Sequence, residues 1–315
     1  MSVNATVPSF AKLNLDLRVL HKRPDNYHEL RTIFQTISLK DTLAIEAERS
    51  KRTEIELDCA LDIADNLVVR AANAVLEHLK ITARVALTLR KNIPMGAGLG
   101  GGSSNAAATL IALPALLGKA IGLAELIGIG EKLGSDVPFF LLGGTAIALG
   151  RGTELYPLPD MLPHHAIVLS TGVHVSTAEA YGVLGRNVTD SLTSQAQSPI
   201  LREFQTIAWS LGASGLDQLP LTNDFERPVF ERHPELSAAA RKLRRMGAKP
   251  AQMTGSGSAV FGIFQTARQA REAASRWSAG TAIPARFVTR RQYKALWQKA
   301  LGPAAQYSHF AQMEG

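Results

Sequence analysis

The segment of this chain that is best suited to chemistry is a cluster of glycines followed by two serines, Pro94-Met-Gly-Ala-Gly-Leu-Gly-Gly-Gly-Ser-Ser104. A stretch with helical character starts directly after it. Bare amide N–H groups and the positive end of a helix dipole together attract anions, and glycine lets a phosphate come close to the backbone. The pattern therefore predicts a phosphate-binding loop, in which Ser103 or Ser104 caps the helix or turns its hydroxyl toward a phosphate-bound Mg²⁺.

Other interpretations of this loop are less favoured. Gly96-x-Gly98-x-x-Gly101 is also typical of dinucleotide-binding loops, which need an acidic residue at the end of a second strand about 20 residues later. Residues 116–125 do not form such a strand pattern, so an NAD(P)-dependent dehydrogenase remains only an alternative, testable by NADH fluorescence. A Walker loop and the signatures of protein kinases do not occur in the chain. A flexible linker is disfavoured because the cluster lies between a strand pattern and a helix pattern.

Two further segments accompany the glycine loop in a fixed order. They are Ala11-Lys-Leu-Asn-Leu15 near the start and Met-Thr-Gly-Ser-Gly-Ser-Ala-Val-Phe at residues 253–261. Together the three motifs resemble the small-molecule kinase superfamily of galactokinase, homoserine kinase and mevalonate kinase, the GHMP kinases. The resemblance implies an α+β, two-domain GHMP kinase fold, with a ribosomal-protein-like α/β domain at residues 1–160 and a ferredoxin-like α+β domain at residues 161–315. It also implies ATP as co-substrate and Mg²⁺.

The resemblance also assigns roles to single residues. Lys12 and Asp136 would be catalytic: Asp136 orients the substrate hydroxyl and accepts its proton, and Lys12 pairs with Asp136 and offsets charge near the transferred group. From the residues alone, the alternatives are a helix N-cap for Asp136 and an exposed strand lysine for Lys12. Ser104 would be the metal ligand. The ATP-binding residues would be Pro94, Gly96, Ala97, Gly98, Leu99, Gly100, Gly101, Gly102, Ser103 and Ser104.

A narrower resemblance comes from Pro24-Asp-Asn-Tyr-His-Glu-Leu30. It is similar to the branch of the superfamily that phosphorylates a cytidine-diphosphate-linked methylerythritol for isoprenoid precursors. Residues 134–140 and 221–226 match the same branch. Asn26 stands where that branch usually has glycine, and asparagine tolerates the left-handed backbone better than most residues, so we expect the turn to persist.

For this substrate the resemblance implies a set of binding residues. Tyr27 would stack on the cytosine ring, His28 would hydrogen-bond its edge, and Tyr181 would be the second aromatic of the base sandwich. Asn14 would contact the substrate beside Lys12. The transfer site would be lined from the second domain by Thr254, Gly255, Ser256 and Gly257, for which a plain Gly-Ser hairpin turn is the alternative.

Two other functions are compatible with parts of the sequence. A homoserine or mevalonate kinase shares the three motifs, but its substrate has no nucleobase for Tyr27 and His28 to bind. The net charge of +7 and the sequence pI near 9.6 suggest an RNA-binding module. Such a module interleaves aromatic with basic residues, whereas aromatics make up 6% of this chain and do not cluster with its basic residues. We therefore expect a small-molecule substrate, no nucleic acid and no membrane, and a monomer or homodimer.

The composition is ordinary for a soluble globular protein. Of the 315 residues, 46% are hydrophobic and 19% charged, and the single Cys59 fits a reducing, cytoplasmic compartment. The first residues lack the features of a secretory signal. The longest uncharged stretch, residues 92–118, contains the glycine cluster and Pro114, so we do not expect it to span a membrane.

The elements that must position these residues can be predicted from periodicity. In the first half we expect strands at residues 11–19, 33–37 and 43–47, with Asp41 as a turn between the last two, and a helix at 66–79 capped by Asp65. A strand at 85–89 precedes the glycine loop, and a buried helix at 105–117 should kink or end early at Pro114. A helix at 124–133, a helix or strand at 137–149 and a linker at 150–159 complete this half.

In the second half we expect strands at 166–170 and 259–264, helices at 235–246 and 267–277, and a Gly/Ser turn at 255–258.

Overall fold

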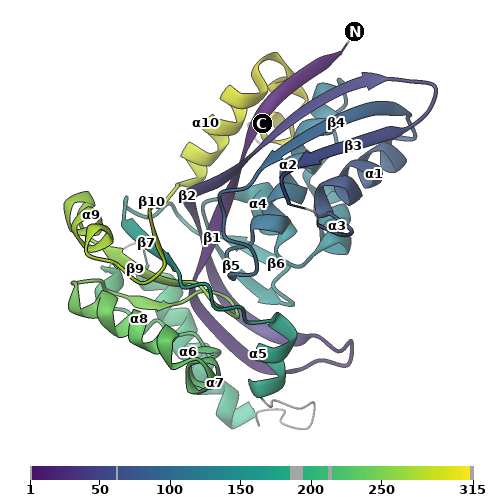
Figure 1. Ribbon diagram of the computed structural model, residues 1–315. Helices are drawn as coiled ribbons and strands as arrows, with labels where there is room; N and C mark the ends of the chain where they lie inside the picture. Colours follow the sequence, from purple (N-terminus) through teal and green to yellow (C-terminus); the bar gives the residue numbers. More distant parts are fainter. Residues whose placement is uncertain (1, 62, 185–193, 212–214, 313–315) are drawn as a thin grey trace.

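Two strands longer than the sequence patterns predict form the central feature of the fold. In the computed structural model, which describes residues 2–61, 63–184, 194–211 and 215–312, β1 (Val3–Lys22) pairs antiparallel with β2 (His28–Arg49) (Figure 1). The prediction of a turn at Asp41 is wrong, because β2 runs unbroken through this residue. The fully buried carboxylate of Asp41 accepts hydrogen bonds from the backbone amides of Asn92 and Ile93. These bonds stabilise the charged group inside the sheet.

The first sheet has the strand order β3-β4-β2-β5-β6, with β1 added on β2. Its other strands are β3 (Glu54–Cys59), β4 (Ala83–Arg90), β5 (Thr145–Gly150) and β6 (Glu154–Pro157). The predicted linker at 150–159 is therefore partly wrong, since β6 pairs with β5 there. The uncertain stretch at 137–149 contains both a helix, α4 (Val137–Leu142), and strand β5, separated by Gly143 and Gly144.

Helices α1 (Leu67–Leu79) and α2 (Gly101–Leu116) pack on this sheet, and α3 (Leu123–Leu133) packs against α1, α2 and α4. The helix expected at 66–79 is confirmed, but its N-cap is Asn66, whose side chain accepts from the Val68 amide, and not Asp65. Helix α2 starts four residues before the predicted 105 and runs through Pro114 to Leu116, so the expected early end at the proline does not occur.

The second sheet is antiparallel throughout, with the order β10 (Thr281–Arg286), β7 (His165–Ser170), β9 (Val260–Phe264) and β8 (Ala251–Met253). The helices of this half are α5 (Thr177–Leu184), α6 (Ser194–Ser210), α7 (Glu226–Arg232), α8 (Pro234–Arg245) and α9 (Ala267–Ser275), with a 3₁₀ turn, η1 (Leu216–Gln218). The predicted strands at 166–170 and 259–264 and the helices at 235–246 and 267–277 are confirmed within about two residues.

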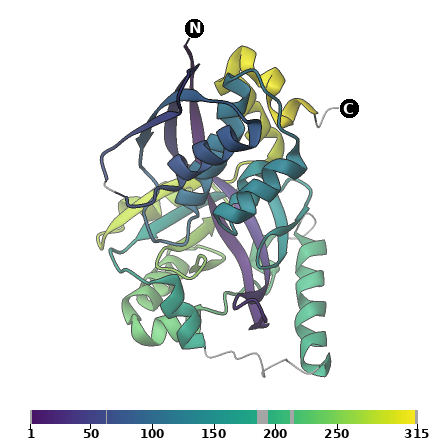
Figure 2. The ribbon, with the colours of Figure 1, turned by 90° about the vertical axis from the view of Figure 1, so that its right-hand side faces the viewer.

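The end of the chain returns to the first sheet. We call residues 290–312 the C-terminal segment; it comprises α10 (Arg290–Leu301), the 3₁₀ helix η2 (Gly302–Tyr307) and α11 (His309–Gln312). Figures 1 and 2 both show it beside the N-terminal half. Its buried side chains Tyr293, Trp297 and Phe310 belong to the same hydrophobic core as α2 and α4. A domain boundary near residue 160 stays a prediction.

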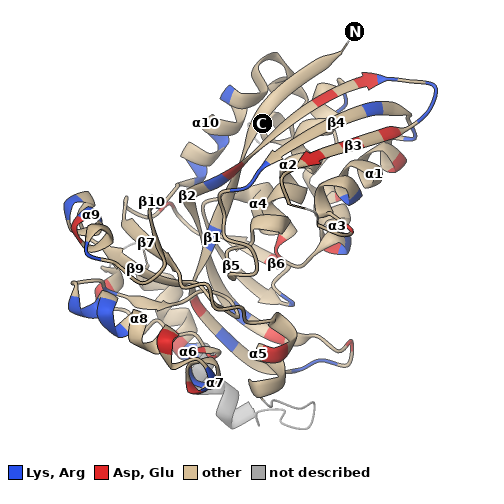
Figure 3. Cartoon of the chain, viewed as in Figure 1, with Lys and Arg blue, Asp and Glu red and all other residues tan. Residues whose placement is uncertain are grey.

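Charged side chains are distributed over both halves of the chain. Figure 3 shows lysines and arginines on α8, α9, α10 and several strands, with acidic residues between them. Among the described residues, every helix is too short or too polar to cross a bilayer.

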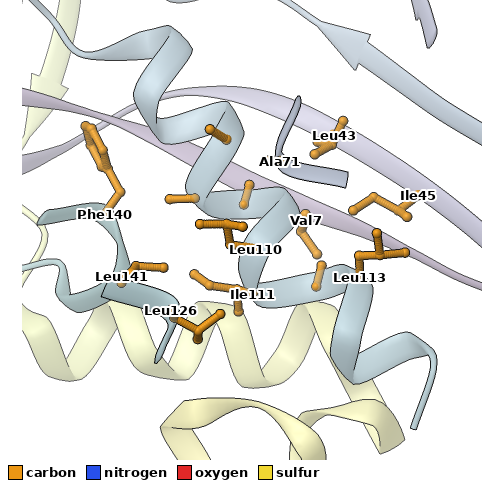
Figure 4. Packing of buried hydrophobic residues seen from close by; sticks show 14 of the residues in the cluster. Val7, Leu43, Ile45, Ala71, Leu110, Ile111, Leu113, Leu126, Phe140 and Leu141 are labelled. Carbon is orange, nitrogen blue, oxygen red and sulfur yellow. The ribbon is translucent and has the colours of Figure 1, made fainter. Parts of the chain in front are cut away.

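The hydrophobic core is divided into three clusters, and β1 contributes to each of them. Around α2, Leu110, Ile111 and Leu113 pack against Phe140 and Leu141 of α4 and against the sheet (Figure 4). Since β1 is covered on both faces, every residue from Val7 to Leu20 is buried, including the polar ones. The polar side chains on this strand therefore have to find partners inside the protein.

Candidate active site

The three sequence motifs meet through main-chain hydrogen bonds. The amide of Lys12 donates to the carbonyl of Leu99 in the glycine loop at 3.0 Å. The amide of Ala259, within the third motif, donates to the carbonyl of Ala97 in the same loop at 3.2 Å. The loop is thus held between β1 and the second sheet, which explains why it needs glycine: a Cβ on Gly98 would lie 2.2 Å from the Thr254 carbonyl oxygen, and its φ is +75°.

The glycine loop lines a cavity of about 340 Å³ at the start of α2. Other lining residues are Ile63, Asp65, Asn66, Leu67, Leu89 and Lys91. The first hydrogen bond of α2 runs from the Ser104 amide to the Gly100 carbonyl, so the amides of Gly101, Gly102 and Ser103 precede the helical ladder. These amides and the helix dipole give the cavity the character of a phosphate site. Of the residues expected to bind ATP, Pro94, Gly96–Gly102 and Ser103 line the cavity and Ser104 does not.

The expectations for the two serines need correction. Neither serine caps α2, because the helix begins at Gly101 and Gly100 occupies the N-cap position. The Ser104 hydroxyl is buried and accepts a hydrogen bond from Ser9 of β1 at 2.9 Å, so it faces the interior and is not suited to bind a metal in the cavity. Ser103 instead lines both this cavity and the neighbouring one that contains Asp136.

A buried polar network supports the loop from behind. The carboxylate of Asp41 is paired with Lys91, and Asn105 of α2 donates to the same carboxylate at 2.9 Å. Lys91 also donates to Asn105 at 2.9 Å, and Asn105 donates to Ser9 at 2.7 Å. Sequence reasoning missed this role of Asp41, and the 50 positions that separate it from Lys91 leave no local signal of the contact.

Lys12 and Asp136, which are far apart in sequence, form an ion pair. Lys12 Nζ lies 3.5 Å from Asp136 Oδ2, and it also donates to Asn14 Oδ1 at 2.5 Å. Lys12 is 3% exposed, so it is not an exposed strand lysine. Asp136 occupies the N-cap position of α4, but its carboxylate is not hydrogen-bonded to the first turn of that helix. Burial lowers the pKa of Lys12, and the charge of Asp136 opposes this effect.

Asn14 connects Lys12 to the second half of the chain. Its side-chain amide donates to Thr32 at 2.8 Å, and its backbone N–H donates to the Thr254 hydroxyl at 3.0 Å.

The loop at 254–257 is fixed in turn by Asn223, whose side chain donates to the carbonyls of Met253 and Gly255. The expected Gly/Ser turn is therefore present, and it is packed into the site rather than forming a free hairpin end. Gly255 and Ser256 line the same cavity as Lys12, Asn14 and Asp136.

A second, larger cavity of about 580 Å³ opens from Asp136 toward the loop between β1 and β2. Tyr27, His28 and Tyr181 all line it. Tyr27 is 50% exposed, and the Arg151 guanidinium covers one face of its ring at 4.2 Å. Tyr181 stacks on His28 with ring centroids 4.5 Å apart, so His28 occupies one face of that ring. Asn26, at φ 67°, supplies the left-handed turn expected of it.

Sequence reasoning missed two residues of this region. Arg151 and Thr177 line both the larger cavity and the one that contains Lys12. Arg151 is flanked by Gly150 and Gly152, both with positive φ. An arginine between two glycines is the sequence feature that could have indicated a binding residue in this turn. Metal-type clusters of three or more His, Cys, Asp or Glu side chains are absent from the part of the chain that the structure describes.

Comparisons with known proteins agree with this geometry. The GHMP kinases N terminal domain matches residues 66–144, and the GHMP kinases C terminal domain matches residues 201–282. The 4-diphosphocytidyl-2-C-methyl-D-erythritol kinase of Solibacter usitatus is 50% identical over 298 residues, which cover 95% of this chain and 93% of that protein. The protein of the same name from Syntrophus aciditrophicus is 41% identical over 267 residues, covering 84% and 91%.

Solved structures give the same result. A crystal structure of 4-(cytidine 5'-diphospho)-2C-methyl-D-erythritol kinase has a TM-score of 0.73 at 35% identity, covering 90% of this chain and 98% of that one. A homoserine kinase from Cytophaga hutchinsonii has a TM-score of 0.70 at 17% identity, covering 91% and 95%, a likeness that shows the fold alone. The expected α+β, two-domain fold is thereby confirmed. The chain belongs to the GHMP kinases, and within them to the 4-diphosphocytidyl-2-C-methyl-D-erythritol kinase family.

Proposed function

We propose that this protein transfers the γ-phosphoryl group of ATP to a hydroxyl of 4-diphosphocytidyl-2-C-methyl-D-erythritol, as the names of its relatives indicate. The observation that carries the proposal is the Lys12–Asp136 pair at 3.5 Å, located between a glycine-lined cavity and a cavity with aromatic residues. The first cavity suits a nucleotide triphosphate, and the second suits an acceptor that carries a base.

Each residue has a distinct task in this mechanism. The amides of the glycine loop hold the phosphates of ATP and direct the terminal group toward Asp136. Asp136 orients the acceptor hydroxyl and takes its proton as the oxygen–phosphorus bond forms and the bond to ADP breaks. Lys12 offsets the negative charge that gathers there. Because the transition state of phosphoryl transfer is loose, positioning and charge stabilisation contribute more than a strong base does.

Mg²⁺ fits this site as a companion of ATP. It prefers oxygen ligands and in kinases is held largely by the nucleotide phosphates with one or two protein oxygens. The Ser103 hydroxyl, which lines both cavities, would be such an oxygen. When bound, the ion would neutralise charge on the β- and γ-phosphates.

Recognition of the acceptor would come from the larger cavity. Tyr27 offers its exposed ring for stacking on cytosine, His28 a hydrogen bond to the edge of the base, and Asn14 a contact beside Lys12. Gly255 and Ser256 would close the transfer site from the second half, while Thr254 and Gly257, which do not line the cavity, would hold this loop in place. The part of Tyr181 as second stacking aromatic stays a prediction, because its ring is stacked on His28 in this structure. We also propose a cytoplasmic location and a monomer or homodimer.

The experiment is an ADP-release assay with a panel of acceptor alcohols: the cytidine-linked methylerythritol, homoserine and mevalonate. We expect turnover with the first alone. Asp136→Asn should lower kcat by about 10² to 10⁴, the range of general-base contributions, with KM for ATP within about twofold. Preference for homoserine or mevalonate would refute the substrate assignment, and near-normal turnover of Asp136→Asn would refute the role of the base.

A further inference from the structure

The C-terminal segment contacts α4, the helix that directly follows Asp136, and it lies beyond residue 282, where the match to the C-terminal family domain ends. We propose that Tyr293 and His309 of this segment are positioning residues, which hold the carbonyl end of α4 and thereby keep Asp136 in line with Lys12. The inference rests on the proposed function, because it gives Asp136 the part of the base.

The hydrogen bonds at the end of α4 support this proposal. The last carbonyls of any helix lack partners within the helix, and α4 has only six residues. The Phe139 carbonyl accepts from the Gly143 amide at 2.9 Å. The next two carbonyls accept from the C-terminal segment: that of Phe140 from the Tyr293 hydroxyl, and that of Leu141 from His309 Nε2 at 2.8 Å.

The turn after α4 is also shaped to fit the segment. Gly143 has φ +63°, and a Cβ there would lie 2.4 Å from Cγ of the Tyr293 ring. The Arg290 guanidinium donates to the carbonyls of Leu158 and Thr145, which fixes the start of α10 beside the same turn. Tyr293 and His309 are each 1% exposed, so both bonds are shielded from water. Such a close contact leaves little freedom for α4 to tilt or shift.

Asp136 depends on the position of α4 because it immediately precedes the helix. Its carboxylate is not tied to the first turn of α4, and its side chain is 33% exposed. The direction of the backbone therefore sets the distance to Lys12. Misplacing a catalytic group by about 1 Å can cost about a hundredfold in rate. Loss of a hydrogen bond at the far end of so short a helix should therefore affect kcat.

The test compares variants of the segment. Tyr293→Phe removes the hydroxyl and keeps the ring, His309→Leu removes the donor, and His309→Gln retains one. Leu301→Ala is the matched control, since Leu301 is a buried residue of α10 whose loss leaves both hydrogen bonds to α4 in place. We expect Tyr293→Phe and His309→Leu to lower kcat about tenfold or more with KM for ATP within about twofold, His309→Gln to restore most of it, and Leu301→Ala to lower Tm without lowering kcat.

Two further measurements separate a positioning role from simple destabilisation. In the Asp136→Asn background, Tyr293→Phe should cause no further loss of kcat, because its effect passes through that carboxylate. Hydrogen exchange of the α4 amides should become faster in Tyr293→Phe and not in Leu301→Ala. Unchanged exchange would overturn the inference, as would an equal loss of kcat in Leu301→Ala or a full effect of Tyr293→Phe in the Asp136→Asn background. If Asp136→Asn itself keeps its turnover, the proposed function fails, and the exchange data still decide whether the segment holds α4.

Discussion

Acidification should destabilise the fold through His309. Burial lowers the pKa of this side chain from 6.5 to about 4, although its hydrogen bond to the Leu141 carbonyl opposes the shift, and nearby Lys294 adds to it. The unfolded chain therefore takes up a proton near pH 6.5, whereas the folded chain resists it until near pH 4. The contribution of this histidine to stability is complete above the higher pKa and is lost as the pH falls toward the lower one.

The size of the effect follows from the two pKa values. One pKa unit corresponds to about 1.36 kcal/mol, so the difference of about 2.5 units sets an upper limit of about 3 kcal/mol. At about pH 5 the unfolded chain is almost fully protonated at this site and the folded chain hardly at all. The free energy of unfolding should then be lower than at about pH 7.5 by about 2 kcal/mol from this residue alone.

The assay is urea unfolding of the wild type and of His309→Gln at both pH values. Glutamine does not titrate, and it retains a donor for Leu141, so the difference between the two proteins isolates the histidine. Other groups, including His164, whose pKa burial also lowers, contribute equally to both proteins and cancel. If the wild type and His309→Gln lose the same amount of stability between the two pH values, the reasoning about His309 is refuted.

Three other predictions concern the site itself. Burial lowers the pKa of Lys12 below the ordinary lysine value of 10.5, although the charge of Asp136 opposes this effect. We therefore expect kcat to fall at a pH below 10.5 as Lys12 loses its proton, and Lys12→Arg to remove this fall from the pH–kcat profile. An unaltered profile would count against a role for the lysine charge. Tyr27→Ala should raise KM for the cytidine-linked acceptor and leave KM for ATP unchanged, and an unchanged acceptor KM would contradict base stacking. Gly98→Ala would place a Cβ 2.2 Å from the Thr254 carbonyl oxygen, so we expect thermal unfolding to show a loss of stability of more than about 1 kcal/mol. Gly102→Ala, whose Cβ would lie 3.6 Å from Leu67, should cause no such loss. Similar Tm losses in both variants would refute the steric explanation.

The sequence alone determined the parts of this protein whose signals are local. The glycine loop could be identified because its pattern, a run of glycines before a helix, involves only neighbouring residues. The helices at 124–133 and 235–246 could be predicted from the periodicity of their own hydrophobic residues. The resemblance of three short motifs then indicated the family. Each of these inferences needs only residues that are close along the chain.

Contacts between distant residues were decided only by the tertiary structure. Aspartate is a common turn residue, yet Asp41 lies inside β2, where Lys91 compensates its charge and Asn105 donates a hydrogen bond to it. The Ser104 hydroxyl faces the interior because Ser9 donates a hydrogen bond to it, and the Tyr293 hydroxyl is positioned by its hydrogen bond to the Phe140 carbonyl of α4. The local sequence does not decide whether a carboxylate or hydroxyl faces solvent or the interior. Partners that folding brings from elsewhere in the chain decide it, because a buried polar group needs a hydrogen bond.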